Sequence, residues 1–441
     1  MIVGIKLLFA LLLLMGLYKL IDTLTIFKAS PYSSKSLKFA FTLKVIAGGF
    51  LFLIYTQYYP DRSTADIFKY YDDGEILYSS TKAHPLDLIK IIAGVENQYL
   101  KEQHLNKMSY WYRPYDHGLR NDNRIVIRIN AVLHVISFGN YFIHALIFIF
   151  LSFLGLFYLA KLFYAVSGSK IKSYFAAFLI PSVFFWTSGV LKEALLIFAL
   201  GLFCWSMFKL ATSFSWSALM LVVLGFLLLF SIKIYVLVAI LPAILFWFLW
   251  MRFKVFWKAS FLFLILGSLC YVSVVVLFPT IDLVSLLVAK QHDFIRLSLE
   301  FNAGSAIQMD YLEENLGSIL RSIPLALAHV FTLPWLSHIK SWLYIGPLLE
   351  NLFLIASSLA SIYFFQKPSK SGVQFLVFAG IFIFTLFTII GLSTPVIGAL
   401  VRYKIPALPF LFFSFFYGIN LREMPLRISQ DKRIIWIQKQ L

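Results

Sequence analysis

The sequence predicts an all-α polytopic membrane protein. The chain has 441 residues, of which 60% are hydrophobic and 13% are charged, and its mean hydropathy is +0.83. Apolar stretches of about 17–25 residues recur from one end of the chain to the other, and such stretches match the roughly 30 Å hydrocarbon core of a bilayer. A soluble protein of this length does not need them, so we expect helices that cross a membrane.

About 11 transmembrane helices are expected, within a range of about 10–13. The first apolar segment, MIVGIKLLFALLLLMGLYKLIDTL, lacks a small-x-small cleavage site after its apolar run. We therefore interpret it as an uncleaved helix and not as a signal peptide. The expected spans form a single integral membrane domain, residues 1–441. They are roughly 2–21, 39–58, 138–160, 174–191, 194–209, 216–231, 234–251, 259–279, 346–366, 373–391 and 405–420.

Two long polar loops interrupt this pattern, 59–128 after the second expected span and 280–345 after the eighth. Loop 59–128 contains ten acidic and ten basic residues, and many of its other residues are Tyr or Trp. Balanced charge with many aromatic residues favours a folded loop with short juxtamembrane helices over a disordered linker. In the second loop, segment 323–336 is apolar but contains Pro324 and Pro334, so we expect it to enter the interface without crossing.

The distribution of Lys and Arg predicts the orientation. Loops 22–38, 161–173, 209–215, 252–258, 367–372 and the tail 421–441 together carry 17 basic residues and three acidic ones. Cytoplasmic loops are enriched in basic residues, so we expect these segments and the C-terminus in the cytoplasm of a bacterial inner membrane. The N-terminus and both long loops then lie outside, although Lys6 opposes this. The net charge of +17 indicates anchoring to anionic lipid, and no nucleic-acid partner is expected.

The first candidate site is the acidic segment ADIFKYYDDGEILY, residues 65–78. In a helix, Asp66, Tyr70 and Asp73 are spaced i, i+4 and i+7, and they share one face. A carboxylate beside tyrosines just outside the bilayer can bind a sugar or accept a proton from an attacking hydroxyl. The alternative is a solvated helix whose acidic residues interact favourably with its N-terminal dipole.

The second group of candidates consists of charged residues beside short outer turns. Lys192 and Glu193 lie in a tight hairpin between two expected spans, and Lys233 lies in another short turn. Arg402, Tyr403 and Lys404 precede the last span. If the helices bring the four cations together, they form a phosphate-binding ring, because Arg and Lys both bind phosphate. A Lys–Glu pair in a polar turn, and snorkelling of single cations, are the alternatives.

These residues together resemble the GT-C glycosyltransferases, polytopic enzymes that use polyprenyl-phosphate sugars. Segment ADIFKYYDDG is similar to the family's outer-loop pattern of a small residue, Asp, three residues and Tyr, and RYKIPALPF is similar to an Arg-Tyr entry to a late helix. The resemblance implies that Asp66 is the catalytic base, with Asp61 and Asp73 behind it. It also implies that Lys192, Arg402 and Lys404 hold the donor phosphate. The long loop follows the second expected span here, whereas in the family it usually follows the first.

The resemblance implies an inverting sugar transfer from a polyprenyl phosphate to a lipid-linked glycan or another cell-envelope acceptor. No cofactor is required, because cations can meet the charge of the departing phosphate; a divalent cation on Asp61, Asp66 or Asp73 is compatible with this chemistry. No histidine pair has a clear ligand spacing, so no metal site is expected. An O-antigen-type polymerase is the first alternative and would depend on several loop arginines. A lipid-linked glycan transporter or flippase is the second, and it predicts charged, broken spans in repeated halves.

Overall fold

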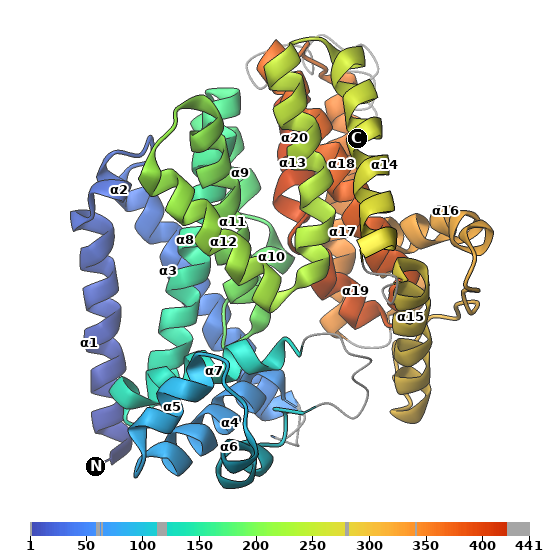
Figure 1. The fold of residues 1–441 in the computed structure, drawn as a ribbon. Helices are drawn as coiled ribbons and strands as arrows, with labels where there is room; N and C mark the ends of the chain where they lie inside the picture. The colour runs from blue at the N-terminus through green and yellow to red at the C-terminus, as the bar shows by residue number, and fades with distance from the viewer. Residues whose placement is uncertain are drawn as a thin grey trace. The chain divides into compact units, whose positions relative to one another are not determined.

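The computed structural model describes residues 2–58, 62, 65–112, 121–277, 282–339 and 342–420, and this part of the chain is helical without strands (Figure 1). Two isolated antiparallel bridges join Ala306 to Val396 and Phe365 to Ile419. The helices are α1 (Ile2–Thr23), α2 (Thr25–Lys28), α3 (Ser34–Leu53), α4 (Asp66–Thr81), α5 (Pro85–Ile92), α6 (Gln98–Gln103), α7 (Asn123–Ser137), α8 (Tyr141–Ser167), α9 (Lys170–Phe178), α10 (Pro181–Trp186), α11 (Lys192–Thr212), α12 (Trp216–Ile232), α13 (Ile234–Phe253), α14 (Phe256–Leu277), α15 (Leu283–Glu300), α16 (Leu316–Thr332), α17 (Ile345–Tyr363), α18 (Lys370–Ser393), α19 (Ile397–Tyr403) and α20 (Leu408–Gly418).

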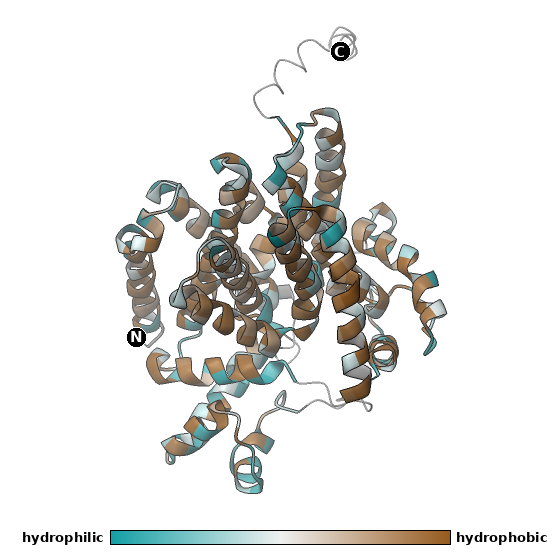
Figure 2. Cartoon of the chain, turned by 45° about the horizontal axis from the view of Figure 1, so that its top comes forward, coloured by the Kyte–Doolittle hydropathy of each residue, from teal (hydrophilic) through white to brown (hydrophobic). Residues whose placement is uncertain are grey.

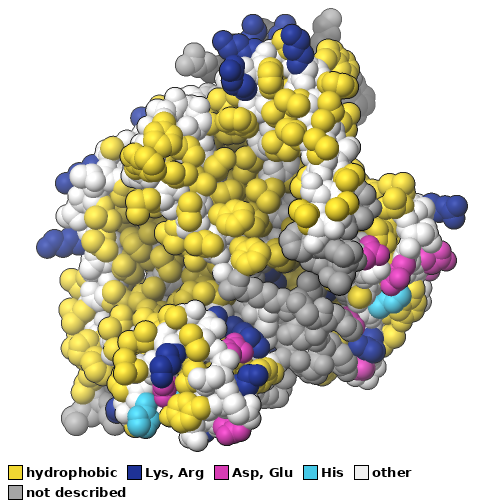
Figure 3. Space-filling model, in the orientation of Figure 1, with side chains coloured by type: hydrophobic (Ala, Val, Ile, Leu, Met, Phe, Trp, Pro, Cys, Tyr) yellow, Lys and Arg dark blue, Asp and Glu magenta, His cyan; other side chains and the backbone are white. Residues whose placement is uncertain are grey.

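The all-helical class is confirmed, and several helices suit a membrane. In the described residues, seven helices are long and apolar enough to cross a bilayer, or eight if the bent pair α19 and α20 forms one span. Figure 2 shows hydrophobic residues along the long helices and hydrophilic residues mainly in short helices and loops. On the face seen in Figure 3, hydrophobic side chains cover most of the middle part, where charged side chains are few. Apolar side chains left exposed on helices of this length are what a lipid environment requires.

One expected span is not a continuous helix. The segment predicted as 174–191 contains α9, a break at Leu179 and Ile180, and then the six-residue α10. Pro181 lacks an N–H donor and disfavours helical geometry at the residue before it, so the helix stops there. After α10 the chain forms a turn, Thr187–Leu191, which is buried throughout.

The chain forms two compact units, residues 1–162 with 182–237 and residues 163–181 with 238–441. In the first unit, α11 packs on α12, α1 on α3, and α4 on α7. Lys6 Nζ donates to the Gly139 carbonyl oxygen at 2.9 Å, and Tyr32 Oη donates to the Ala160 carbonyl oxygen at 2.9 Å. The first bond places the start of α1 beside the start of α8, the end at which Figure 1 shows α4 to α7, and the second ties the connection between α2 and α3 to the far part of α8.

The described part of loop 59–128, in the first unit, is folded, as its composition predicts. It contains α4, α5, α6, a 3₁₀ turn (Leu105–Lys107) and the start of α7. The predicted shared face of α4 packs against α7, and Tyr70, Asp73 and Leu77 on it are buried. Gly74 permits this contact, because a Cβ at that position would lie 2.6 Å from the Cβ of Asn130.

In the second unit, α18 packs against α15, α16 and α20, and α20 also contacts α9 and α17. Its core is rich in phenylalanine; the Phe163 and Phe413 rings stack with centroids 4.4 Å apart. Helices α19 and α20 meet at a bend of 65°. The loop predicted as 280–345 contains α15 and α16, and α16 includes Pro324.

Candidate functional site

Asp66 is the first residue of α4, and its carboxylate is partly accessible. Its side chain is 26% exposed, and Lys69 Nζ lies 3.2 Å from its Oδ1 one helical turn later. A negative charge in the first turn interacts favourably with the helix dipole. The ammonium group of Lys69 also lies 5.3 Å from the centroid of the Tyr110 ring. Asp66 is therefore connected to the segment that contains Tyr110.

Asp73 anchors that same segment from the buried face of α4. Its Oδ1 accepts the backbone N–H of Ser109 at 3.0 Å, and its Oδ2 accepts that of Tyr110 at 2.7 Å. Burial raises the pKa of Asp73 above its ordinary value, although both hydrogen bonds act in the opposite direction. The carboxylate of Asp73 thus holds the backbone of Ser109 and Tyr110 in place, whereas the carboxylate of Asp66 is more accessible to solvent than that of Asp73.

Three polar residues lie at the start of α7, Asn121, Asp122 and Asn123, and the two asparagines bind the backbone of Tyr110 and Trp111. Asn123 Nδ2 donates to the Tyr110 carbonyl oxygen at 3.0 Å, and Asn121 Nδ2 donates to that of Trp111 at 2.9 Å. The Asn123 backbone N–H donates to Asn121 Oδ1 at 3.0 Å. These bonds attach the start of α7, where Asp122 is the N-cap residue, to Tyr110 and Trp111.

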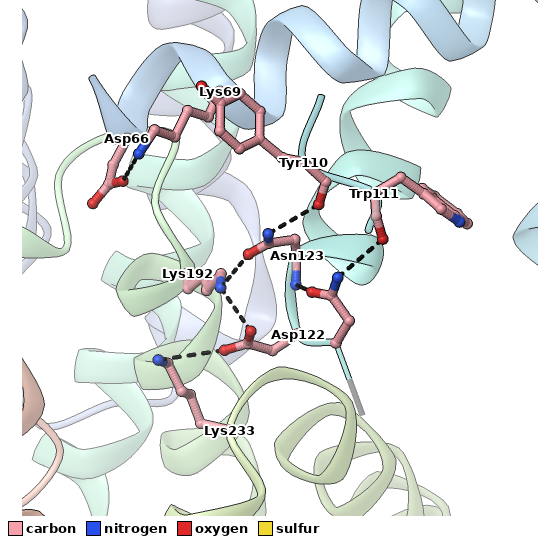
Figure 4. A network of polar contacts seen from close by, with 9 residues as sticks. Asp66, Lys69, Tyr110, Trp111, Asp122, Asn123, Lys192 and Lys233 are labelled. Carbon is pink, nitrogen blue, oxygen red and sulfur yellow. Dashed lines mark hydrogen bonds and ion pairs between the residues drawn. The ribbon is translucent and has the colours of Figure 1, made fainter. Parts of the chain in front are cut away.

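Two lysines from separate helix ends converge on Asp122 (Figure 4). Lys192, the first residue of α11, donates from Nζ to Asp122 Oδ1 at 2.8 Å and to Asn123 Oδ1 at 2.6 Å. Lys233, which follows α12, places its Nζ 3.4 Å from Asp122 Oδ2. The two lysine side chains are only 8% and 11% exposed. Lys192 also lies 5.3 Å from the ring centroid of Tyr70. The predicted substrate-binding residues Tyr70, Lys192 and Lys233 thus meet in one cluster.

A buried lysine holds the turn that leads into Lys192. Lys44 lies in α3 and is fully buried, and its Nζ donates to Thr187 Oγ1 at 2.7 Å and to the Thr187 carbonyl oxygen at 3.3 Å. Gly48, one turn further along α3, allows the same turn to approach, because a Cβ there would lie 2.6 Å from the Ser188 carbonyl oxygen. An ionisable residue inside a span is costly and therefore indicates a specific role.

A pocket of about 200 Å³ lies near the cluster of Lys192, Lys233 and Asp122. Its described lining is Gly94, Glu96, Asn121, Arg124, Ile125, Arg128 and Ser231. Arg124 Nη1 donates to Glu96 Oε1 at 2.7 Å, and Arg128 Nη2 lies 3.9 Å from the same oxygen. Neither these residues nor Asp122 were among the site residues predicted from the sequence. The available signal was the polar triplet 121–123 before a helix with arginines four residues apart.

The remaining predicted cations belong to the second unit. Lys404 lies at the bend between α19 and α20, is 1% exposed, and donates from Nζ to Asn351 Oδ1 at 2.8 Å. Arg402 and Tyr403 end α19, and the Tyr403 ring lies 6.4 Å from that of Phe294. Asn351 Nδ2 in turn donates to the Pro334 carbonyl oxygen at 3.1 Å, so Lys404 is part of a buried polar cluster.

The last two residues predicted for the site are Glu193 and Asp61. Glu193 is the second residue of α11 and is buried, at the helix end where a negative charge is favourable. Asp61 lies outside the described residues. Within the described ranges, no three His, Cys, Asp or Glu side chains are grouped as metal ligands.

Comparison with protein-family models, with curated proteins and with solved structures finds no match for this chain. The structure itself defines the class: in the described residues it is an all-helical protein with seven or eight helices long and apolar enough to cross a membrane, and with short helices in its first polar loop.

Proposed function

We propose that this protein is a membrane glycosyltransferase that moves a sugar from a polyprenyl phosphate to a glycan acceptor. The observation that carries the proposal is that the side chains of Lys192 and Lys233 both contact the carboxylate of Asp122, which belongs to loop 59–128. Paired ammonium groups can hold a phosphate, and their place at the ends of apolar helices suits a phosphate attached to a lipid tail.

The proposed reaction is an inverting transfer. An acceptor hydroxyl attacks the anomeric carbon, the bond from that carbon to the phosphate oxygen breaks, and the phosphate leaves with the bonding electrons. Asp66 takes the hydroxyl proton as the new glycosidic bond forms. Lys192 and Lys233 stabilise the negative charge that develops on the departing phosphate. Asp122 keeps both ammonium groups in place before the donor binds.

The expected setting is the outer face of a bacterial cytoplasmic membrane. Loop 59–128 and the starts of α8 and α11 then face outward, where a lipid carrier presents the sugar. The positive-inside distribution of the basic loops supports this orientation.

The experiment uses the full chain in nanodiscs with radiolabelled polyprenyl-phosphate sugars and a lipid-linked glycan acceptor. Asp66→Asn should lower the transfer rate by about 10²–10⁴-fold, the usual contribution of a general base. Asp72→Asn is the matched control on the same helix, because Asp72 pairs with Arg62 at the surface. Full transfer by the Asp66 variant would exclude the base role.

The lysines are tested through the donor. Lys192→Ala and Lys233→Ala should raise the donor KM by about tenfold or more, because each removes a charge-assisted contact to phosphate. Lys209→Ala, at the exposed far end of α11, is the control and should behave as the wild type. An unchanged donor KM in both cluster variants would contradict phosphate binding at this site.

A polysaccharide polymerase is the second candidate, and a specific observation favours it. Loop arginines are expected in such an enzyme, and Arg124 and Arg128 line the pocket beside the cluster. The length of the product separates the two functions. A single added sugar supports the glycosyltransferase, whereas a ladder of repeating units supports the polymerase.

A further inference from the structure

We infer that the pocket lined by Glu96, Asn121, Arg124, Arg128 and Ser231 is a subsite for an acidic sugar residue of the acceptor glycan. We name it the arginine pocket. The identification of the ligand as part of the acceptor rests on the proposed function, but binding of an acidic sugar to this pocket is independent of catalysis.

The position of the arginine pocket favours an acceptor. Asn121 precedes Asp122 in the chain, and Ser231 lies two residues before Lys233. Two residues of the pocket lining are therefore close in the chain to residues of the lysine cluster. A group bound in the pocket lies next to the place proposed for the donor phosphate, as an acceptor must.

The size and chemistry of the arginine pocket favour a sugar. Its volume of about 200 Å³ is below the roughly 300–1,000 Å³ of pockets for drug-sized ligands. The described lining offers guanidinium and amide donors together with a carboxylate acceptor and a hydroxyl. Hydroxyl groups of a sugar both donate and accept hydrogen bonds, so they can use all of these partners, whereas an alkyl chain can use none.

The two arginines favour a negative charge on that sugar. Arg124 and Arg128 lie four residues apart in α7, which places both on one face of the helix. A planar guanidinium can bind a carboxylate through two parallel hydrogen bonds. The described lining contains two guanidinium groups and one carboxylate, so its formal charge is positive.

Aromatic contacts prearrange both guanidinium groups. They lie over the ring of Trp111, at 5.4 Å for Arg124 and 5.0 Å for Arg128, and Trp111 is fully buried. Arg124 Nε also donates to the Trp111 carbonyl oxygen at 3.1 Å. Side chains fixed in this way lose little conformational entropy when a ligand binds.

The test measures binding by saturation-transfer NMR to the full chain in nanodiscs. The probes are methyl glucuronide, methyl glucoside and inorganic phosphate. We expect methyl glucuronide to bind at least tenfold more tightly than methyl glucoside, because the carboxylate adds a charge-assisted contact. Equal binding of the two glycosides, or binding of phosphate alone, would overturn the inference.

Matched variants locate the binding. Arg128→Lys keeps the charge but loses the planar fork, so it should weaken methyl glucuronide binding by about tenfold while methyl glucoside changes little. Lys107→Ala removes an exposed cation of the same loop and should have no effect. Wild-type glucuronide binding in the Arg128 variant would place the ligand elsewhere. Glucuronide binding by a chain that performs no transfer would refute the proposed function and leave the pocket assignment standing.

Discussion

Helices α8 and α11 cross at two glycines, and this crossing yields a sharp prediction about stability. A Cβ added to Gly201 would lie 2.0 Å from the carbonyl oxygen of Gly155 and 2.7 Å from its carbonyl carbon. Cβ atoms essentially never lie closer than 3.0 Å to a non-bonded atom of another part of the chain, so Gly201→Ala requires a shift of at least 3.0 − 2.0 = 1.0 Å. The obstacle is backbone, which cannot rotate aside as a side chain can.

The cost of that shift follows from packing. Overpacking of a close-packed interior typically costs about 1–3 kcal/mol. A gap of 0.5–1 Å between the helices also removes about a quarter to a half of each affected dispersion contact. The residues of α11 near the crossing, including Ile197 and Leu200, are fully buried and lose such contacts. We expect the Gly201→Ala variant to lose about 2–3 kcal/mol of unfolding free energy.

The assay compares thermal stability in detergent by fluorescence-detected size-exclusion chromatography. The control is Gly49→Ala in α3, because a Cβ there meets nothing within 4 Å and Ala favours a helix by about 1 kcal/mol. The Gly49 variant should therefore melt at or above the wild-type temperature, and the Gly201 variant clearly below it. A Gly201→Ala protein as stable as the Gly49→Ala protein would refute the close crossing.

Two further predictions concern the folded loop. Asp73→Asn should lower the local free energy of unfolding by about 1–3 kcal/mol, because the NH2 group of the new side chain faces a backbone N–H and cannot accept its hydrogen bond. Hydrogen exchange of the Ser109 and Tyr110 amides should therefore accelerate. Unchanged exchange at both amides would contradict the anchoring role of Asp73. Burial holds the pKa of His134 below its ordinary value of 6.5, so the folded state binds fewer protons than the unfolded state and loses stability as pH falls below about 6.5. The melting temperature should drop between about pH 7.5 and 5, with a shallower slope in His134→Leu, and equal slopes would disprove this contribution.

Most helices could be located from the sequence because their signal is local. The expected spans 216–231 and 346–366 correspond closely to α12 (Trp216–Ile232) and α17 (Ile345–Tyr363). The prediction of one continuous helix over 174–191 is wrong. The average hydropathy of this segment resembles that of a span, but Pro181 interrupts the helix. Averaging over a window conceals one residue that cannot continue a helix.

The candidate site was predicted only in part. Lys192 and Lys233 were predicted from the sequence as cations that could meet, and the structure brings both to one carboxylate. That carboxylate, Asp122, was not predicted, and it is 70 residues from Lys192 in the chain. Lys44 was also not predicted, because a single lysine barely changes the mean hydropathy of its span.

By itself, the sequence determined that the chain is helical and suited to a membrane, that the polar loop 59–128 is folded and not a disordered linker, and that Asp66, Tyr70 and Asp73 share a face if they lie in a helix. These properties depend on the hydrophobicity, charge and spacing of neighbouring residues. The tertiary structure decided which side chains meet: Lys192 and Lys233 at Asp122, and Lys44 at Thr187. The physical reason is that helix packing depends on close fits, such as those at Gly48 and Gly74. Such fits join residues far apart in the chain, and no local pattern records them.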